Sequence, residues 1–185
     1  MTHVLLVRHG EADYGPINDR GWPGFASELA PLTPDGIAQA VAAADELAGA
    51  GATYLVSAPA TRALHTAAVI GHRLALGVRV DFDLREWAAD RAGAWRGLAD
   101  IRAALRDFEA YEGEWPVGTS RPWEQLSDVR ERVVAALQRH LDATAGPVIV
   151  VTHAMVIRAL TGDSDIDPGG VRRHVLVPDL AADDA

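Results

Sequence analysis

Short apolar runs that alternate with segments of helical periodicity limit the fold of this chain more than any other feature of its sequence. Buried strands are predicted at residues 4–7, 54–56 and 147–151, because each run is short, apolar and ends at polar or turn-forming residues. Weaker strand candidates are residues 78–80 and 175–177. The alternation indicates an α/β protein, and we predict a three-layer α/β/α sandwich with a mainly parallel central sheet.

Helices are predicted between these strands. Thr33 is a suitable N-cap with Pro34 at the first helical position, and apolar residues then recur at helical spacing as far as Leu47. Loops are expected after the first strand, where Gly, Pro, Asn and Asp gather, and at residues 112–122. The other expected helices cover residues 61–76, 98–111, 123–141 and 154–160.

Length and composition limit the possible classes of protein. The 185 residues suffice for one substantial core, so we expect a single domain over residues 1–178, followed by a mobile acidic tail at residues 179–185. No apolar stretch is long enough to span a membrane and the first residues lack a secretory signal, so the cytoplasm is the expected location. A net charge of -9 argues against a nucleic-acid partner. The lack of cysteine excludes disulfides, a thiol nucleophile and cysteine-ligated zinc.

Polar residues gather just after the predicted strands, where open α/β sheets bind their ligands. Arg8 and His9 follow the first strand, and Arg62 lies near the start of the helix after the second. Glu86 comes after the third strand and His153 after the fourth. We therefore predict that two histidines, two arginines and one carboxylic acid meet at one edge of the sheet.

These residues lie in motifs that resemble those of the histidine phosphatase superfamily, also called the phosphoglycerate mutase-like family. The segment Arg8-His9-Gly10-Glu11 is similar to its RHGE signature. Residues 31–40 resemble its PLTxxGxxQA helix start, residues 57–67 its SxPxxRAxxTA stretch, and residues 150–158 the region around its second histidine. Because the four motifs occur in the family's order over almost the whole chain, the resemblance implies a phosphoglycerate mutase-like fold and phosphoryl-transfer chemistry.

The chemistry of the residue types agrees with this resemblance. A neutral imidazole attacks phosphorus near neutral pH without an activating base, so His9 is the expected nucleophile and would form a phosphohistidine. Arg8, Arg62 and a protonated His153 are expected to bind the phosphoryl group. By resemblance, Glu86 is the candidate proton donor, which requires a raised pKa and predicts an acidic optimum. No metal or other cofactor is expected.

Three positions depart from the family's pattern. Gly15 stands where the family often has a phosphate-contacting asparagine, and Tyr14 or Asn18 is a possible replacement for that contact. Ala154 replaces the glycine that usually follows the second histidine, and Arg96 stands where the common GxWEG pattern has glutamate. These departures leave a non-catalytic module that binds a phosphorylated ligand as an alternative.

The expected function is a phosphatase that hydrolyses a phosphomonoester of a small metabolite or of a phosphoprotein. A mutase-type phosphotransferase is a second alternative, although mutases of this family are usually longer. Residues 112–122 are also short for a lid that encloses the intermediate and excludes water. The natural substrate and the oligomeric state stay open at this point.

Several other residues have two interpretations. Glu11 is either a second carboxylate in the pocket or a residue that ties down the loop after the first strand through a salt bridge. Tyr14, Trp22, Trp87 and Trp95 either wall a substrate pocket or fill a core, and the core interpretation is favoured for each tryptophan.

Overall fold

The computed structural model describes residues 3–22 and 24–176, and five strands in these ranges form one sheet in the order β3-β2-β4-β1-β5. The first four strands in this order are parallel to one another. The edge strand β5 is antiparallel to β1. The predicted α/β class with a mainly parallel sheet is therefore confirmed. The strands are β1 (His3–Arg8), β2 (Tyr54–Ser57), β3 (Val78–Val80), β4 (Val148–Thr152) and β5 (Val171–Val175).

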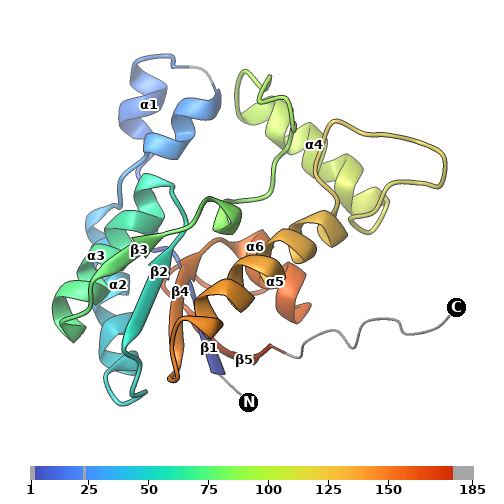
Figure 1. Ribbon diagram of the computed structural model, residues 1–185. Helices are drawn as coiled ribbons and strands as arrows, with labels where there is room; N and C mark the ends of the chain where they lie inside the picture. The colour runs from blue at the N-terminus through green and yellow to red at the C-terminus, as the bar shows by residue number, and fades with distance from the viewer. Residues whose placement is uncertain (1–2, 23, 177–185) are drawn as a thin grey trace, which may run out of the picture.

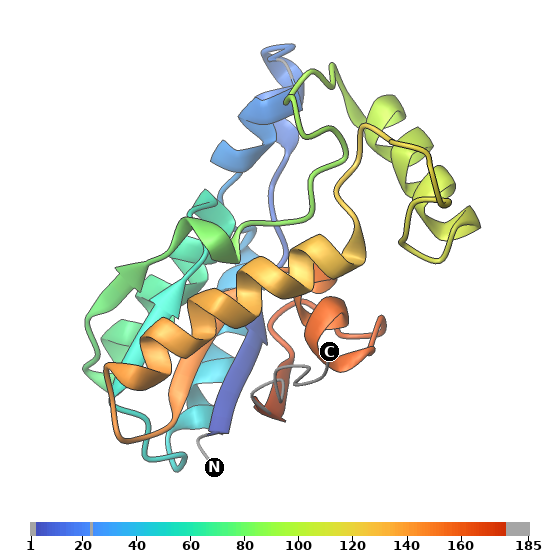
Figure 2. The same ribbon diagram turned by 45° about the vertical axis from the view of Figure 1, so that its right-hand side comes forward.

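Helices cover both faces of the sheet and complete three layers. Helices α2 and α3 pack against each other, and so do α5 and α6. Figure 2 shows α5 across one face of the sheet, with α2 and α3 behind it. Helices α1 and α4 stand beyond the carboxyl ends of the parallel strands (Figure 1). The helices are α1 (Gly15–Asp19), η1 (Gly24–Leu29), α2 (Pro34–Leu47), α3 (Thr61–Leu74), η2 (Phe82–Leu84), α4 (Leu98–Ala110), α5 (Leu126–Asp142) and α6 (Ala154–Thr161), where η marks a 3₁₀ helix.

The three central strands form the middle of the core. Every residue of β2 and β4 is buried, and so are the four apolar residues of β1. Parallel strands covered by helices on both faces bury both sets of side chains, which is why they appear in the sequence as continuous apolar runs. No helix within the described residues is long and apolar enough to cross a membrane.

Two parts of the fold differ from the expectations. The loop expected after β1 contains the short helices α1 and η1, whose few residues carry no long periodic pattern. The last strand lies at Val171–Val175 rather than at residues 175–177, because it is a half-exposed edge strand and contains Arg172, Arg173 and His174. Val177 and the acidic tail at residues 179–185 lie outside the described residues.

Candidate active site

The carboxyl ends of β2, β4 and β1 lie side by side, because these strands are neighbours in the sheet. His9 directly follows β1, His153 directly follows β4, and Arg62 is in the first turn of α3, after β2. Glu86 lies two residues after η2, in a segment with neither helix nor strand. The structure brings these four side chains together through the contacts described below.

The His9 imidazole is held in one orientation. Its Nδ1 lies 2.7 Å from the carbonyl oxygen of Gly10, which accepts the ring proton, so Nε2 carries the free lone pair. Arg62 Nε donates to this Nε2 at 3.3 Å. Burial, and then the positive charge of Arg62, lower the pKa of His9 to about 4. His9 is therefore neutral near pH 7.

The backbone beside His9 is fixed by a close contact between the loop after β1 and the start of α2. A Cβ at Gly10 would lie 2.3 Å from the carbonyl oxygen of Gly36, and a Cβ at Gly36 would lie 2.2 Å from that of Glu11. Only glycine fits at either position, because these distances are far inside normal contact. Gly10 N also donates to Thr66 Oγ1 at 3.0 Å, which ties the loop to α3.

Arg62 is a buried cation that contacts both histidines. Besides its bond to His9, its Nη2 lies 3.4 Å from His153 Nδ1 and 3.2 Å from Glu28 Oε1. Its Nη1 donates to the carbonyl oxygen of Ser27 at 3.3 Å. All three guanidinium nitrogens thus have partners in the unliganded protein. An anion that binds Arg62 must replace some of these contacts.

His153 is fully buried, with its Nδ1 3.9 Å from Glu86 Oε2 and its ring centroid 5.1 Å from that of His9. Its Nε2 has no hydrogen-bond partner among the described residues. Burial, and then the charge of Arg62, lower the pKa of His153 well below its usual value. His153 is therefore neutral in the unliganded protein.

Glu86 has the opposite electrostatic behaviour. Burial raises its pKa to about 7, although Trp87 N donates to its Oε1 at 2.9 Å and Arg62 lies nearby. The side chain of Glu86 is nevertheless 28% exposed to solvent. A carboxylic acid that is half protonated near pH 7 can both donate and accept a proton there. The structure therefore provides the raised pKa that the proton-donor role of Glu86 requires.

The guanidinium of Arg8 is hydrogen-bonded to the chain before β5. Its Nη1 donates to the carbonyl oxygen of Ile166 at 2.6 Å. Its Nε is buried without a hydrogen-bond partner among the described residues. Arg8 nevertheless contributes to the site through its charge, which helps to lower the pKa values of His9 and His153.

Glu28 and Ser27 are the site residues that the sequence analysis did not identify. Both belong to η1, and both contact the guanidinium of Arg62. The segment was expected to be a loop, and no spacing or motif distinguishes Glu28 from the other acidic residues of this chain. The contact between Glu28 and Arg62 depends on the packing of η1 against α3.

The structure decides between the two interpretations of Glu11. Its carboxylate accepts a hydrogen bond from Thr33 Oγ1 at 2.7 Å, so it ties the loop to the start of α2, through a hydrogen bond rather than a salt bridge. Tyr14 and Asn18 are exposed, on and beside α1. No hydrogen bond among the described residues joins either side chain to the residues of the site.

The aromatic residues are divided between core and surface. Trp87 is buried in the core, as favoured. The core interpretation is wrong for Trp22, which is 47% exposed. Trp95 is half-buried and packs so tightly on Gly24 that a Cβ there would lie 1.8 Å from its Cδ1 atom.

Residues 4–177 match the sequence model of the histidine phosphatase superfamily (branch 1). Glucosyl-3-phosphoglycerate phosphatase of Mycobacterium tuberculosis is 31% identical over 172 residues, which cover 85% of this chain and 73% of the relative. The bifunctional protein Rv2228c of the same species is 36% identical over 167 residues, or 86% of this chain. The chain spans only 43% of the length of that second relative.

A solved structure agrees with the sequence relatives. The mycobacterial glucosyl-3-phosphoglycerate phosphatase Rv2419c in complex with VO3 superposes with a TM-score of 0.70 at 26% identity. The superposition covers 94% of this chain and 90% of that chain. The predicted phosphoglycerate mutase-like architecture is therefore shared with a solved phosphatase.

Proposed function

The chain belongs to the histidine phosphatase superfamily, and on this premise we propose that it hydrolyses phosphomonoesters through a covalent phosphohistidine at His9. One observation carries the proposal. A neutral imidazole with its Nε2 lone pair beside a buried arginine shares a site with Glu86, whose pKa is raised to about 7. A nucleophile, an anion-binding cation and a proton donor are the three groups that phosphomonoester cleavage needs.

In the first step, Arg62 Nε turns from His9 Nε2 to the phosphoryl group, the freed Nε2 lone pair attacks phosphorus, and the bond between phosphorus and the ester oxygen breaks. The leaving alkoxide takes the proton of Glu86. The Nδ1 proton stays on the ring and keeps its hydrogen bond to the carbonyl oxygen of Gly10, which orients the ring and stabilises the positive charge that develops on it. Phosphorylation is therefore expected at Nε2 rather than at Nδ1.

Three groups are proposed to bind the phosphoryl oxygens. Arg62 exchanges its contact with Glu28 for phosphate, and the unpartnered Nε2 of His153 and Nε of Arg8 supply further donors. A phosphoryl dianion favours the charged form of a nearby imidazole, so it raises the pKa of His153 from its low unliganded value. His153 would then carry its positive charge only while the phosphoryl group is bound.

In the second step, water attacks the phosphohistidine. Glu86, now a carboxylate, takes the proton from water, the phosphorus–nitrogen bond breaks, and inorganic phosphate leaves. His9 recovers its neutral form with the lone pair on Nε2. The proton that Glu86 takes from water restores its protonated form, so the site returns to its starting state without any added cofactor.

The proposed substrate is a phosphorylated small metabolite or a phosphoprotein. Two of the similar proteins are named as glucosyl-3-phosphoglycerate phosphatases, so this compound belongs in any panel of candidates. The test is to incubate the protein with a panel of phosphorylated metabolites and phosphopeptides, and to measure free phosphate and acid-labile, base-stable phosphoprotein. Phosphate release with transient phosphoprotein is the expected result. Transfer to an acceptor without phosphate release would indicate a mutase, and tight binding without turnover a binding module.

The pH dependence of kcat/KM is expected to be bell-shaped, with limbs near pH 4 and pH 7. The carboxyl group of Glu86 must be protonated to donate, so activity falls as pH rises through its pKa of about 7. The imidazole of His9 must be neutral to attack, so activity also falls as pH drops through its pKa of about 4. Steady-state kinetics on a glycerol phosphate substrate measure both limbs. A Glu86→Gln variant that kept the alkaline limb would show that another group causes it.

Glu28→Gln is expected to tighten the binding of inorganic phosphate. In the unliganded protein the Glu28 carboxylate holds Arg62 at 3.2 Å and competes with the anion. Its side chain is 42% exposed, so the gain is limited to about fivefold, the range of a partly exposed ion pair. Isothermal titration with phosphate measures the change. Glu46→Gln, an exposed carboxylate on α2 that loses the same charge, is the matched control, and equal affinities for both variants would contradict the prediction.

A further inference from the structure

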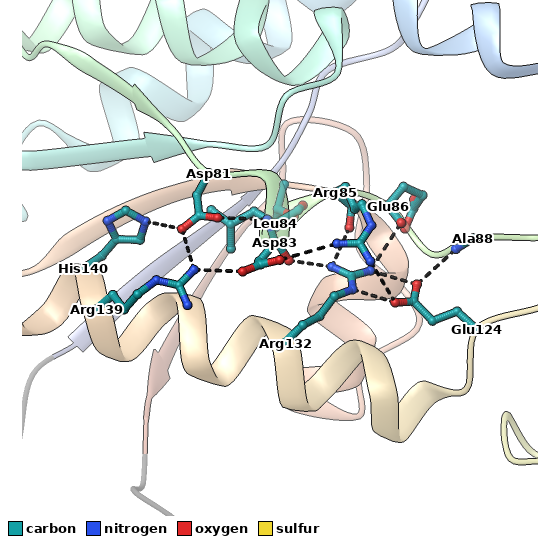
Figure 3. Close-up of polar contacts among 11 residues, drawn as sticks. Asp81, Asp83, Leu84, Arg85, Glu86, Ala88, Glu124, Arg132, Arg139 and His140 are labelled. Carbon is teal, nitrogen blue, oxygen red and sulfur yellow. Dashed lines mark hydrogen bonds and ion pairs between the residues drawn. The ribbon is translucent and has the colours of Figure 1, made fainter. Parts of the chain in front are cut away.

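A nearly enclosed arginine on α5, Arg132, holds the backbone around Glu86. Arg132 Nη1 donates to the carbonyl oxygens of Asp83 at 2.5 Å and Arg85 at 3.0 Å, and Nη2 donates to that of Glu86 at 3.3 Å. Figure 3 shows the guanidinium reaching from α5 to these carbonyl oxygens. Residues 85–97 belong to no helix or strand, so the ladders of regular structure do not fix this segment. Arg132 supplies three of the hydrogen bonds that hold this part of the chain instead.

Glu124 completes the arrangement from the other side. Its carboxylate binds Arg132 through two bonds, of 2.7 Å to Nε and 3.0 Å to Nη2. The same carboxylate accepts from Ala88 N at 3.2 Å, and Glu124 N donates to the carbonyl oxygen of Ala88 at 2.9 Å. The indole of Trp87 donates to the carbonyl oxygen of Glu124 at 2.6 Å. The residues on both sides of Glu86 are therefore fixed to one ion pair.

Helix α5 connects this ion pair to the rest of the active site. It packs on the sheet through buried Val129, Val133 and Ala136, and the sheet carries His9 and His153 at its strand ends. The distance between the carboxyl group of Glu86 and the two imidazoles therefore depends on where α5 holds residues 83–88. A misplacement of a reacting group by about 1 Å is enough to lower a rate by about 100-fold.

We propose that Arg132 and Glu124 are positioning residues, which hold the carboxyl group of Glu86 at the distance from His9 that protonation of the leaving group needs. The inference rests on the proposed role of Glu86 as the proton donor. The two side chains are nearly enclosed, at 11% and 7% exposure, and carry opposite charges. Two charges are costly to bury, and an apolar pair could fill the same space, so the guanidinium fork is used here for its several directed donors.

The test compares leaving groups, because only poor leaving groups need the proton. Nitrophenolate leaves without protonation, whereas the alkoxide of glycerol phosphate requires it. The measure is kcat/KM, which covers the steps up to the release of the leaving group and leaves out hydrolysis of the phosphohistidine, in which Glu86 also acts. In Arg132→Lys, which keeps the charge but loses the fork, kcat/KM for glycerol phosphate is expected to fall by about 10- to 100-fold. The kcat/KM for p-nitrophenyl phosphate is expected to stay within about threefold of the wild-type value, because phosphoryl binding and attack by His9 are untouched.

Two further variants keep the result interpretable. Glu124→Gln removes the other half of the ion pair and is expected to produce the same difference between substrates, even if Arg132→Lys folds poorly. Arg130→Met is the matched control, because Arg130 is exposed on the same helix and donates to the carbonyl oxygen of Ala159 rather than to the backbone around Glu86. It is expected to hydrolyse both substrates at wild-type rates.

Glu86→Gln separates the failure of this inference from the failure of the proposed mechanism. If Glu86→Gln lowers kcat/KM for both substrates equally, Glu86 is not the proton donor, and both proposals are wrong. If Glu86→Gln slows only glycerol phosphate, while Arg132→Lys and Glu124→Gln slow both substrates equally or neither, the proton donor is correct and the positioning role is wrong. Selective loss on glycerol phosphate in all three variants supports both.

Discussion

His9→Ala is expected to lower kcat/KM for phosphomonoesters by on the order of 10⁴-fold or more, because the variant has no atom to form the phosphoryl–enzyme bond. Acid-labile, base-stable phosphoprotein should disappear at the same time. Rapid quenching of a reaction with ³²P-labelled substrate measures the phosphoprotein, and phosphate release measures turnover. In the wild-type protein, ³¹P NMR should place the phosphoryl group on Nε2, because Nδ1 carries the ring proton and donates it in a hydrogen bond to the carbonyl oxygen of Gly10.

The control for this experiment is His72→Ala, since His72 is exposed on α3 and has no contact with the site. It should keep wild-type turnover and wild-type phosphoprotein. If His9→Ala hydrolysed substrate at a comparable rate, a different group would be the nucleophile. If turnover disappeared but phosphoprotein persisted, the intermediate would lie on another residue.

Arg62→Met is expected to reduce kcat/KM by about 10³-fold or more, because it removes the buried cation that stabilises charge on the transferring phosphoryl oxygens. The structure also predicts a change that is visible without substrate. The charge of Arg62 lowers the pKa of both His9 and His153, so both pKa values should rise in the variant. Titration of the imidazole signals by NMR measures this rise.

Arg73→Met is the matched control for Arg62→Met, because it removes an arginine of the same helix that is exposed and pairs with Asp45. It should change neither the kinetics nor the titration of His9. A loss of activity without any rise in the pKa of His9 would contradict the electrostatic account of the site. A rise in the pKa with unchanged activity would show that Arg62 does not serve the phosphoryl group.

The fold was predictable where burial leaves a regular pattern. Strands β1, β2 and β4 are buried on both faces, so each appears as a continuous apolar run that ends near a polar site residue. Helix α2 was equally predictable, because Thr33 followed by Pro34 is a typical helix start. In the structure Thr33 does cap this helix and accepts a hydrogen bond from Gly36 N. The edge strand β5 was predicted a few residues too late and the short helices α1 and η1 were missed, because half-exposed or very short elements leave no such pattern.

The membership of the site was also largely predictable, since parallel strands bring residues that follow them to one edge of the sheet. His9, Arg62, Glu86 and His153 do meet there, although they are far apart in the chain. Glu28 was not predictable, because its contact with Arg62 depends on where η1 lies. The contacts of Arg132 and Glu124 were not predictable either, because they depend on how α5 packs beside residues 83–88.

The sequence by itself determined which residues follow the buried strands, and therefore which chemical groups the site contains. Only the tertiary structure decided their protonation states. His153 is neutral in the unliganded protein, His9 has a pKa of about 4, and Glu86 has a pKa of about 7. The reason is that desolvation and Coulomb interactions depend on depth of burial and on distances between groups such as Arg62 and His9, which lie 53 residues apart in the chain.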